Sequence, residues 1–138
     1  MEWLELLPHQ PPMRLLEEIT SVIPGEQAVA RRVAKLEDFY FQGHFPRNPI
    51  VPAIILVEMV AQAGGLAAGA PLDDNSQPIL NLRVAAIGPF KFPAAARPGM
   101  MLEATARLTG KLGGLYKIDG TVTADGTLVA TGTLTLAG

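Results

Sequence analysis

Cysteine is absent from all 138 residues of the sequence. Its absence excludes disulfide bonds, thiolate catalysis and metal sites built from cysteine. Histidine, the other common ligand of transition metals, occurs only as His9 and His44, which do not have the close spacing of a zinc site. We therefore expect neither a metal centre nor a cofactor.

Charged residues are also scarce, at 17% of the chain with a net charge of −2. Nucleic-acid-binding proteins concentrate basic side chains on one surface, so this composition argues against such a partner. The first ten residues are acidic where a secretory signal would be basic, which favours a cytoplasmic location. The long apolar stretch at 49–70 contains Glu58 near its middle, and a carboxylate at the bilayer centre costs about 3 kcal/mol. We therefore expect no membrane span.

What the sequence has in abundance is apolar residues, which make up 49% of the chain. This content, in a chain of 138 residues without a repeat, linker or low-complexity tract, predicts one globular domain spanning residues 1–138. A helix is predicted from Ala53 to Ala68, opened by Pro52 and apolar on nearly every face, which is typical of a core helix. Only Glu58 and Gln62 interrupt it, and their spacing places both on one face.

The C-terminal part of the chain predicts an antiparallel meander. Residues 102–109 alternate between apolar and polar side chains, and tight turns follow at Gly113-Gly114 and Asp125-Gly126. The last strand is predicted to turn Leu128, Ala130, Leu134 and Leu136 towards the core. Such a sheet leaves its apolar face bare unless the helix covers it, so the fold class is predicted to be α+β.

Three further strands are predicted before the meander. The first covers residues 13–23, the second and weaker one covers 27–35, and the third covers 78–88. The third is predicted to continue through residues 90–92 as an edge segment that ends at Pro93, because proline cannot donate to a sheet ladder.

Glu58 is the most informative single residue, because a carboxylate in an apolar helix is costly unless it has a partner. One interpretation is structural, with Glu58 accepting hydrogen bonds that pin the helix. The other is an acid–base pair with His44, placed in the proline-rich loop before the helix. Glu58 lies roughly 9 Å along the helix from Pro52, so either the loop folds back or a second chain supplies one of the two groups.

The same residues carry a family resemblance. The stretch His44–Pro52, HFPRNPIVP, is followed by Glu58 fourteen residues after His44 and by Ala61-Gln62. This arrangement resembles the β-hydroxyacyl-acyl-carrier-protein dehydratases of bacterial fatty-acid synthesis. The similarity extends to LPHQPPMRLLEEI at 7–19 and FKFPAAARPG at 90–99. Glutamate at position 58, rather than aspartate, resembles the dehydratase-only branch of the family.

The resemblance implies a hotdog fold, in which a curved antiparallel sheet wraps a long central helix. It also implies dehydration of a (3R)-3-hydroxyacyl thioester on acyl carrier protein to the trans-2-enoyl thioester, in fatty-acid, polyene or polyketide biosynthesis. His44 would be the base and Glu58 the acid, since apolar neighbours favour a neutral carboxyl group. The backbone N–H of Ala53 would stabilise the thioester oxygen. Positioning roles are expected for Gln62, Phe45 and Pro52.

Three departures from the family pattern affect the predicted identity of the substrate and leave both catalytic side chains in place. Ala53 stands where the family usually has glycine, and Met100 follows Gly99 where an acidic residue is usual. The family's basic, proline-containing run is here Pro93-Ala94-Ala95-Ala96. Ala94–Ala96 are expected to lie near the acyl tunnel and to reshape it.

The resemblance also implies partners. Carrier proteins are acidic, so Arg47, Lys91 and Arg97 are candidates for docking. The family pairs hotdogs edge to edge, as a homodimer or a trimer of dimers, with His44 of one subunit facing Glu58 of the partner subunit. His9, a lone histidine in a proline-flanked loop, is expected to be structural.

Two other functions remain open at this point. A hotdog acyl thioesterase would use Glu58 to activate water, although such hydrolases generally lack the HFP loop. A non-catalytic acyl-binding homologue would keep the fold without the chemistry, but the presence of both His44 and Glu58 argues against it. No Gly-x-Ser-x-Gly motif supports serine hydrolysis.

Overall fold

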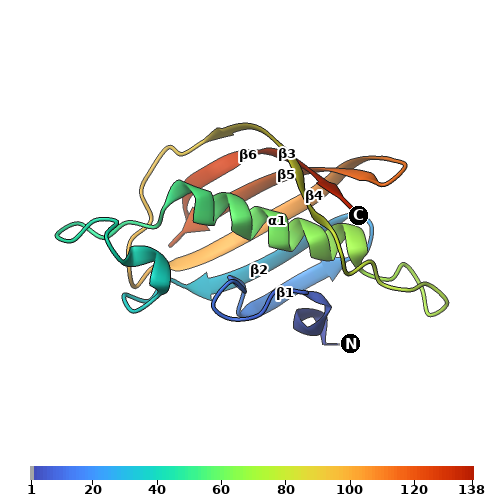
Figure 1. The fold of residues 1–138 in the computed structure, drawn as a ribbon, viewed down its shortest axis with the longest axis horizontal. Coiled ribbons are helices and arrows are strands. Elements are labelled where there is room, and N and C mark those ends of the chain that lie inside the picture. Colours follow the sequence, from blue (N-terminus) through green and yellow to red (C-terminus); the bar gives the residue numbers. More distant parts are fainter. Residues whose placement is uncertain (1) are drawn as a thin grey trace.

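The computed structural model describes residues 2–138, which form one α-helix lying across a six-stranded sheet (Figure 1). The helix is α1 (Ala53–Gly69), and two short 3₁₀ helices are η1 (Trp3–Leu6) and η2 (Phe39–Phe41). The strands are β1 (Glu18–Ile23), β2 (Gln27–Val33), β3 (Arg83–Lys91), β4 (Met101–Leu112), β5 (Leu115–Ala124) and β6 (Thr127–Ala137). Their order is β1-β2-β4-β5-β6-β3 and every neighbouring pair is antiparallel, so the α+β prediction is confirmed.

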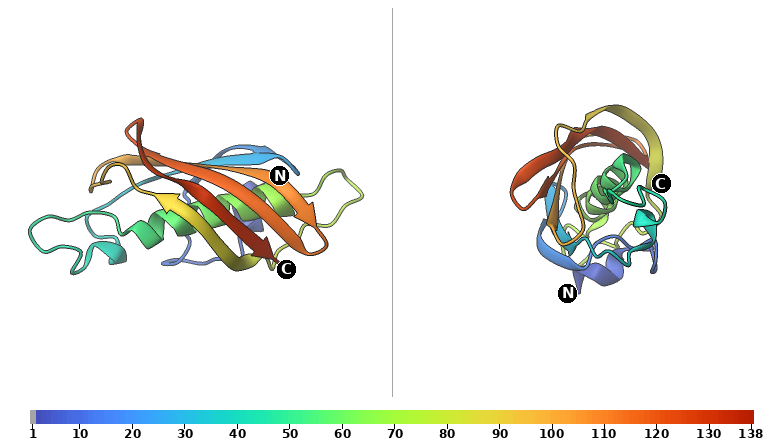
Figure 2. Two further views of the ribbon diagram at one scale, coloured as in Figure 1. Left: turned by 90° about the horizontal axis from the view of Figure 1, so that it is seen from above. Right: turned by 90° about the vertical axis from the view of Figure 1, so that its left-hand side faces the viewer.

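The sheet curves around α1, as the end-on view shows (Figure 2). The β4–β5–β6 meander forms as predicted, and Asp125 and Gly126 have φ values of 47° and 84°. Positive φ at both central residues gives the turn a twist that matches the flanking strands. Leu102, Ala104 and Ala106 of β4 are fully buried, and they form part of the surface on which the helix packs.

The helix continues through Gly64-Gly65 and ends at Gly69. Its predicted burial on every face is wrong at the N-terminal end, where Ile54 is 76% exposed and Ala53 is also exposed. The Glu58 side chain, one turn beyond Ile54, keeps 27% of its accessible surface. One stripe of α1 is therefore left uncovered by the chain's own sheet. Within residues 2–138, no helix combines the length and apolar character required to cross a bilayer.

Three strand boundaries differ from prediction, two of them because a side chain or the helix takes the backbone groups. β1 begins at Glu18 rather than Met13, since the Gln62 amide binds the Met13 carbonyl and the Leu15 N–H. β3 begins at Arg83 rather than residue 78, and the Ile79 N–H bonds the carbonyl of Gly69 at the end of α1. β3 ends at Lys91 on the sheet edge, as predicted, while β2 ends at Val33, two residues early.

A bulge in β6 corrects the predicted inward face of that strand. Val122 pairs with Ala130 but Thr123 pairs with Leu128, so Val129 is an extra residue on its strand. The bulge changes the alternation, because the extra residue shifts which side chains face the core. Val129 and Ala130 are both buried, whereas Leu128 is 38% exposed.

Gly120 on β5 permits the closest approach between the helix and the sheet. A Cβ atom at this position would lie 2.1 Å from Cγ1 of Val60 on α1. Val60 and the neighbouring core residues are fully buried, so they have little space into which to move.

We expect Gly120→Ala to lower the free energy of unfolding by about 1–3 kcal/mol, because the added methyl group overpacks the helix–sheet contact. Urea denaturation monitored by circular dichroism measures the change. The matched control is Gly110→Ala on β4, where the nearest atom to an added Cβ is 3.7 Å away. The control should change stability by no more than about 0.5 kcal/mol. Equal effects of the two substitutions would contradict the packing argument.

Candidate active site

His44 lies in the loop of residues 42–52 that connects η2 to α1, and this loop holds its imidazole ring in one orientation. The Ile50 N–H donates to the His44 carbonyl at 3.0 Å, and the Nδ1 atom of the His44 ring lies 3.1 Å from the Ile50 carbonyl oxygen. A carbonyl oxygen can only accept, so Nδ1 carries the hydrogen of the neutral ring. The lone pair is then on Nε2, which is available to take a proton.

An apolar cavity of about 420 Å³ adjoins His44. Its lining residues come from the His44 loop, the start of α1 and the segment after β3, and they are His44, Phe45, Ile50, Val51, Ala53, Leu56, Phe92 and Ala94–Ala96. Ala94–Ala96 therefore line a cavity beside His44, while the role of this cavity as an acyl tunnel stays a prediction. We call this space the His44 cavity.

Phe45, a predicted positioning residue, and Ala53, the predicted donor to the thioester oxygen, both line the His44 cavity. Phe45 stacks on the His44 ring with 4.4 Å between centroids, so it limits how the ring can turn. Ala53 is the first residue of α1, where backbone N–H groups lack helical partners and the helix dipole favours negative charge. Pro52 precedes it as the N-cap residue, and its carbonyl accepts the first helical hydrogen bonds, from Ile55 and Leu56.

Glu58 lies apart from His44. Within residues 2–138, no hydrogen bond or ion pair joins the two side chains, and Glu58 is not among the residues that line the His44 cavity. The Oε2 atom of Glu58 instead accepts a hydrogen bond from Nε2 of Gln62 at 3.0 Å and lies 3.4 Å from Nε2 of His9. A single chain therefore does not bring the predicted acid and base together.

Gln62 is the buried polar residue of the core, with 1% of its surface exposed. Its Oε1 accepts the Leu15 N–H at 2.9 Å, and its Nε2 donates to the Met13 carbonyl at 2.8 Å as well as to Glu58. These bonds meet the requirement that buried polar groups have partners. The predicted orienting role of Gln62 is consistent with this geometry, because one amide fixes both Glu58 and the segment after His9.

Sequence reasoning missed the position of His9, which lies against Glu58 although 49 residues separate them in the chain. The expected structural role took no account of this contact. The available signal was that His9 belongs to the stretch at 7–19 that carried part of the family resemblance.

The segment that leads into the His44 loop is fixed by a charged network around Asp38. The Asp38 carboxylate pairs with Arg32 and accepts hydrogen bonds from the Lys35 N–H and the Tyr40 hydroxyl, at 2.9 and 2.8 Å. Burial alone would raise the pKa of Asp38, but these donors outweigh it and lower the pKa below the ordinary value. Burial, together with Asp38, raises the pKa of Tyr40. Asp38 therefore stays ionised and Tyr40 stays a donor at neutral pH.

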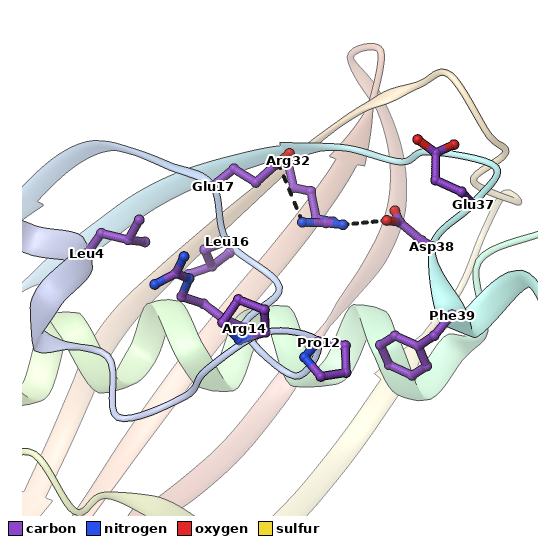
Figure 3. Close-up of a pocket in the computed structure, with 10 residues that line it drawn as sticks. Leu4, Pro12, Arg14, Leu16, Glu17, Arg32, Glu37, Asp38 and Phe39 are labelled. Atoms are coloured by element: carbon purple, nitrogen blue, oxygen red, sulfur yellow. Dashed lines mark hydrogen bonds and ion pairs between the residues drawn. The ribbon is translucent and has the colours of Figure 1, made fainter.

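A larger cavity, of about 460 Å³, lies beside this network (Figure 3). Figure 3 shows Arg32 between Glu17 and Asp38, and Arg14 and Phe39 also line the cavity. None of the predicted catalytic residues lines this cavity. Cavity size alone therefore does not identify the site, whereas the chemistry of His44 points to the smaller cavity. Among residues 2–138, no cluster of three or more metal-binding side chains occurs.

The three predicted docking residues are exposed, and each lies within two residues of one that lines the His44 cavity. The Arg97 side chain donates to Oδ1 of Asn48, the neighbour of Arg47, and the Val51 N–H donates to the Ala96 carbonyl. These bonds join the segment after β3 to the His44 loop. Lys91 ends β3, next to the cavity residue Phe92.

The chain is similar to known proteins over most of its length. The model of the FabA-like domain matches residues 7–133. A 3-hydroxyacyl-[acyl-carrier-protein] dehydratase FabZ of Campylobacter curvus is 34% identical over 123 residues, covering 87% of this chain and 83% of the relative. The FabZ of Ligilactobacillus salivarius is 36% identical and covers 86% and 84%.

Among solved structures, the dehydratase heterocomplex ApeI:P from Xenorhabdus doucetiae superposes with a TM-score of 0.75 at 18% identity, over 96% of this chain and 87% of that one. The E. coli PaaI protein superposes with a TM-score of 0.66 at 19% identity, over 88% and 82%. At these identities the structural matches show the shared hotdog fold alone. The sequence matches show more: the chain belongs to the FabA-like family and, within it, to the FabZ-type 3-hydroxyacyl-acyl-carrier-protein dehydratases.

Proposed function

We propose that the protein dehydrates (3R)-3-hydroxyacyl thioesters carried on acyl carrier protein, in fatty-acid or related biosynthesis, at a site made from His44 of one subunit and Glu58 of another. The observation that carries the proposal is the His44 ring, held through Nδ1 by Ile50 at the wall of an apolar cavity. An acyl chain fits such a cavity, and a proton-accepting Nε2 beside it fits removal of hydrogen from the α-carbon.

The reaction needs a base, an acid and a donor to the thioester oxygen. Nε2 of His44 takes the α-proton, the C–H electrons form the new double bond, and the β-hydroxyl leaves with a proton from Glu58 as water. Negative charge that develops on the thioester oxygen is stabilised by the N–H of Ala53 at the start of α1. Ala53 supplies the same N–H as glycine would, and adds one methyl group to the cavity wall.

The exposed surfaces of the chain support the need for a second subunit. Ile54 and Glu58 lie on one stripe of α1 that the sheet does not cover. β3 is an edge strand on which Val84 and Ile87 are 37% and 60% exposed, and an apolar edge of this kind favours pairing. Two-fold pairing along β3 would cover both surfaces and bring His44 towards Glu58 of the partner subunit. A dimer is the smallest assembly of this kind, and a trimer of dimers would contain the same shared site.

We expect His44→Ala and Glu58→Gln each to lower the rate of hydration of a 2-enoyl thioester by about 100-fold or more, since each removes a proton-transfer group. Hydration is followed by the loss of enoyl-thioester absorbance, and circular dichroism verifies that the variants fold. Release of free thiol by the unmodified protein, in place of hydration, would show a thioesterase instead.

The same two variants test whether the site is shared. Mixed refolding produces heterodimers in which one of the two sites retains both His44 and Glu58 on facing subunits. Activity should therefore rise well above that of either variant alone. If heterodimers form, as native mass spectrometry can show, and activity does not rise, each site lies within one chain.

Docking of the carrier protein is proposed to use Arg47, Lys91 and Arg97. Reversal of each charge should raise KM for carrier-bound substrate, with a larger effect at low salt, because an acidic partner is attracted over about a Debye length. A pantetheine thioester without the carrier should show no such change. Lys117→Glu is the matched control, since Lys117 is exposed on β5 near the hairpin at the far end of β4. An equal rise in KM for the pantetheine thioester would exclude a docking role.

A further inference from the structure

His9 is the unexplained member of the Glu58 environment. Its Nε2 atom lies 3.4 Å from Oε2 of Glu58, and both side chains are largely covered, with 29% and 27% of their surfaces exposed. Gln62 binds the same oxygen, Oε2, at 3.0 Å. Two nitrogen atoms on different elements, one on the N-terminal loop and one on α1, therefore converge on a single carboxyl oxygen.

The surroundings of the His9 ring indicate which nitrogen carries the hydrogen. Nδ1 is buried and has no hydrogen-bond partner within residues 2–138. A buried N–H without a partner is rarer in proteins than a buried acceptor without one, so Nδ1 is better assigned the lone pair. The hydrogen then lies on Nε2, where it points at the carboxyl oxygen, whereas two lone pairs facing one another would repel.

With this tautomer, Oε2 of Glu58 accepts the hydrogen bond from Gln62 and also lies 3.4 Å from the N–H of His9. A neutral carboxyl group carries one hydrogen, and the oxygen that already faces two N–H groups is not the one that holds it. The transferable hydrogen is thereby placed on Oε1. We propose that His9 is a positioning residue that, with Gln62, fixes the Glu58 carboxyl group so that Oε1 faces the substrate; this inference rests on the proposed role of Glu58 as the acid.

A purely structural role explains His9 less well. The N-terminal loop is already tied to α1 by the bonds of Gln62 to Met13 and Leu15, and by the buried side chain of Leu7. The His9 ring, in contrast, keeps a polar atom buried without a partner, which is a cost to the folded state. The polar contact that the His9 ring makes is with Glu58, the candidate acid of the active site.

The test compares His9→Ala, His9→Gln and Gln10→Ala in the full-length protein. His9→Ala removes the Nε2–H group and should lower kcat by about 10-fold with little change in KM, because substrate binding does not involve the His9 ring. A glutamine amide can present an N–H at nearly the same place, so His9→Gln should recover kcat to within about threefold of the unmodified protein. Gln10→Ala changes an exposed neighbour and should leave kcat unchanged.

A merely structural histidine would give a different result, in which the alanine and glutamine variants are equally active per folded molecule. That outcome, or full kcat in His9→Ala, would overturn the proposal. Nitrogen-15 NMR of the histidine rings provides a readout independent of activity, with the Nε2–H tautomer expected for His9 and the Nδ1–H tautomer counting against it. If the unmodified protein showed no dehydratase activity, the proposed function would fail, while the tautomer would still decide whether His9 donates to Glu58.

Discussion

The burial of α1 is the constraint on which the rest of this structure depends. A helix of 17 residues with two polar side chains is unfavourable in water, and within residues 2–138 the curved sheet is the large apolar surface that covers it. Close packing is possible because Gly120 offers no side chain where Val60 approaches. The position of the buried helix therefore determines where the loops at its two ends lie.

Fixing the helix also fixes the chemistry at its N-terminal end. The His44 loop leads directly into α1 through Pro52. His44 and Ala53, the first residue of the helix, therefore line the same cavity. Glu58 lies more than a turn further along, on the stripe that the sheet leaves uncovered. The separation of the two groups in one chain and the exposed apolar surface beside Glu58 are consequences of the same geometry, and the second subunit proposed above would account for both.

Gln62 links this arrangement to the N-terminus. A buried amide has to satisfy its donors and its acceptor, and Gln62 does so with backbone groups of Met13 and Leu15 and with the Glu58 carboxyl group. The same bonds hold the loop that carries His9 against α1. One core residue thus couples the segment just before β1 to the orientation of the candidate acid.

The sequence by itself determined the elements that depend on local order: the apolar helix after Pro52, the alternating strands of the meander and the turns at Gly113-Gly114 and Asp125-Gly126. It also determined the family, because the spacing of His44, Glu58 and Gln62 lies within one continuous stretch. Local periodicity and turn chemistry are sufficient for these features.

Only the tertiary structure decided what depends on partners distant in the chain. The hydrogen bonds of Gln62 determine where β1 begins. Pairing with β5 produces the bulge that exposes Leu128, and packing of the N-terminal loop on α1 brings His9 to Glu58. No pattern within a short window records such contacts, because each is chosen by the fold as a whole. Whether Glu58 lies beside His44 was likewise a question of geometry, and the single chain keeps them apart because a rigid helix separates the loop from the carboxylate.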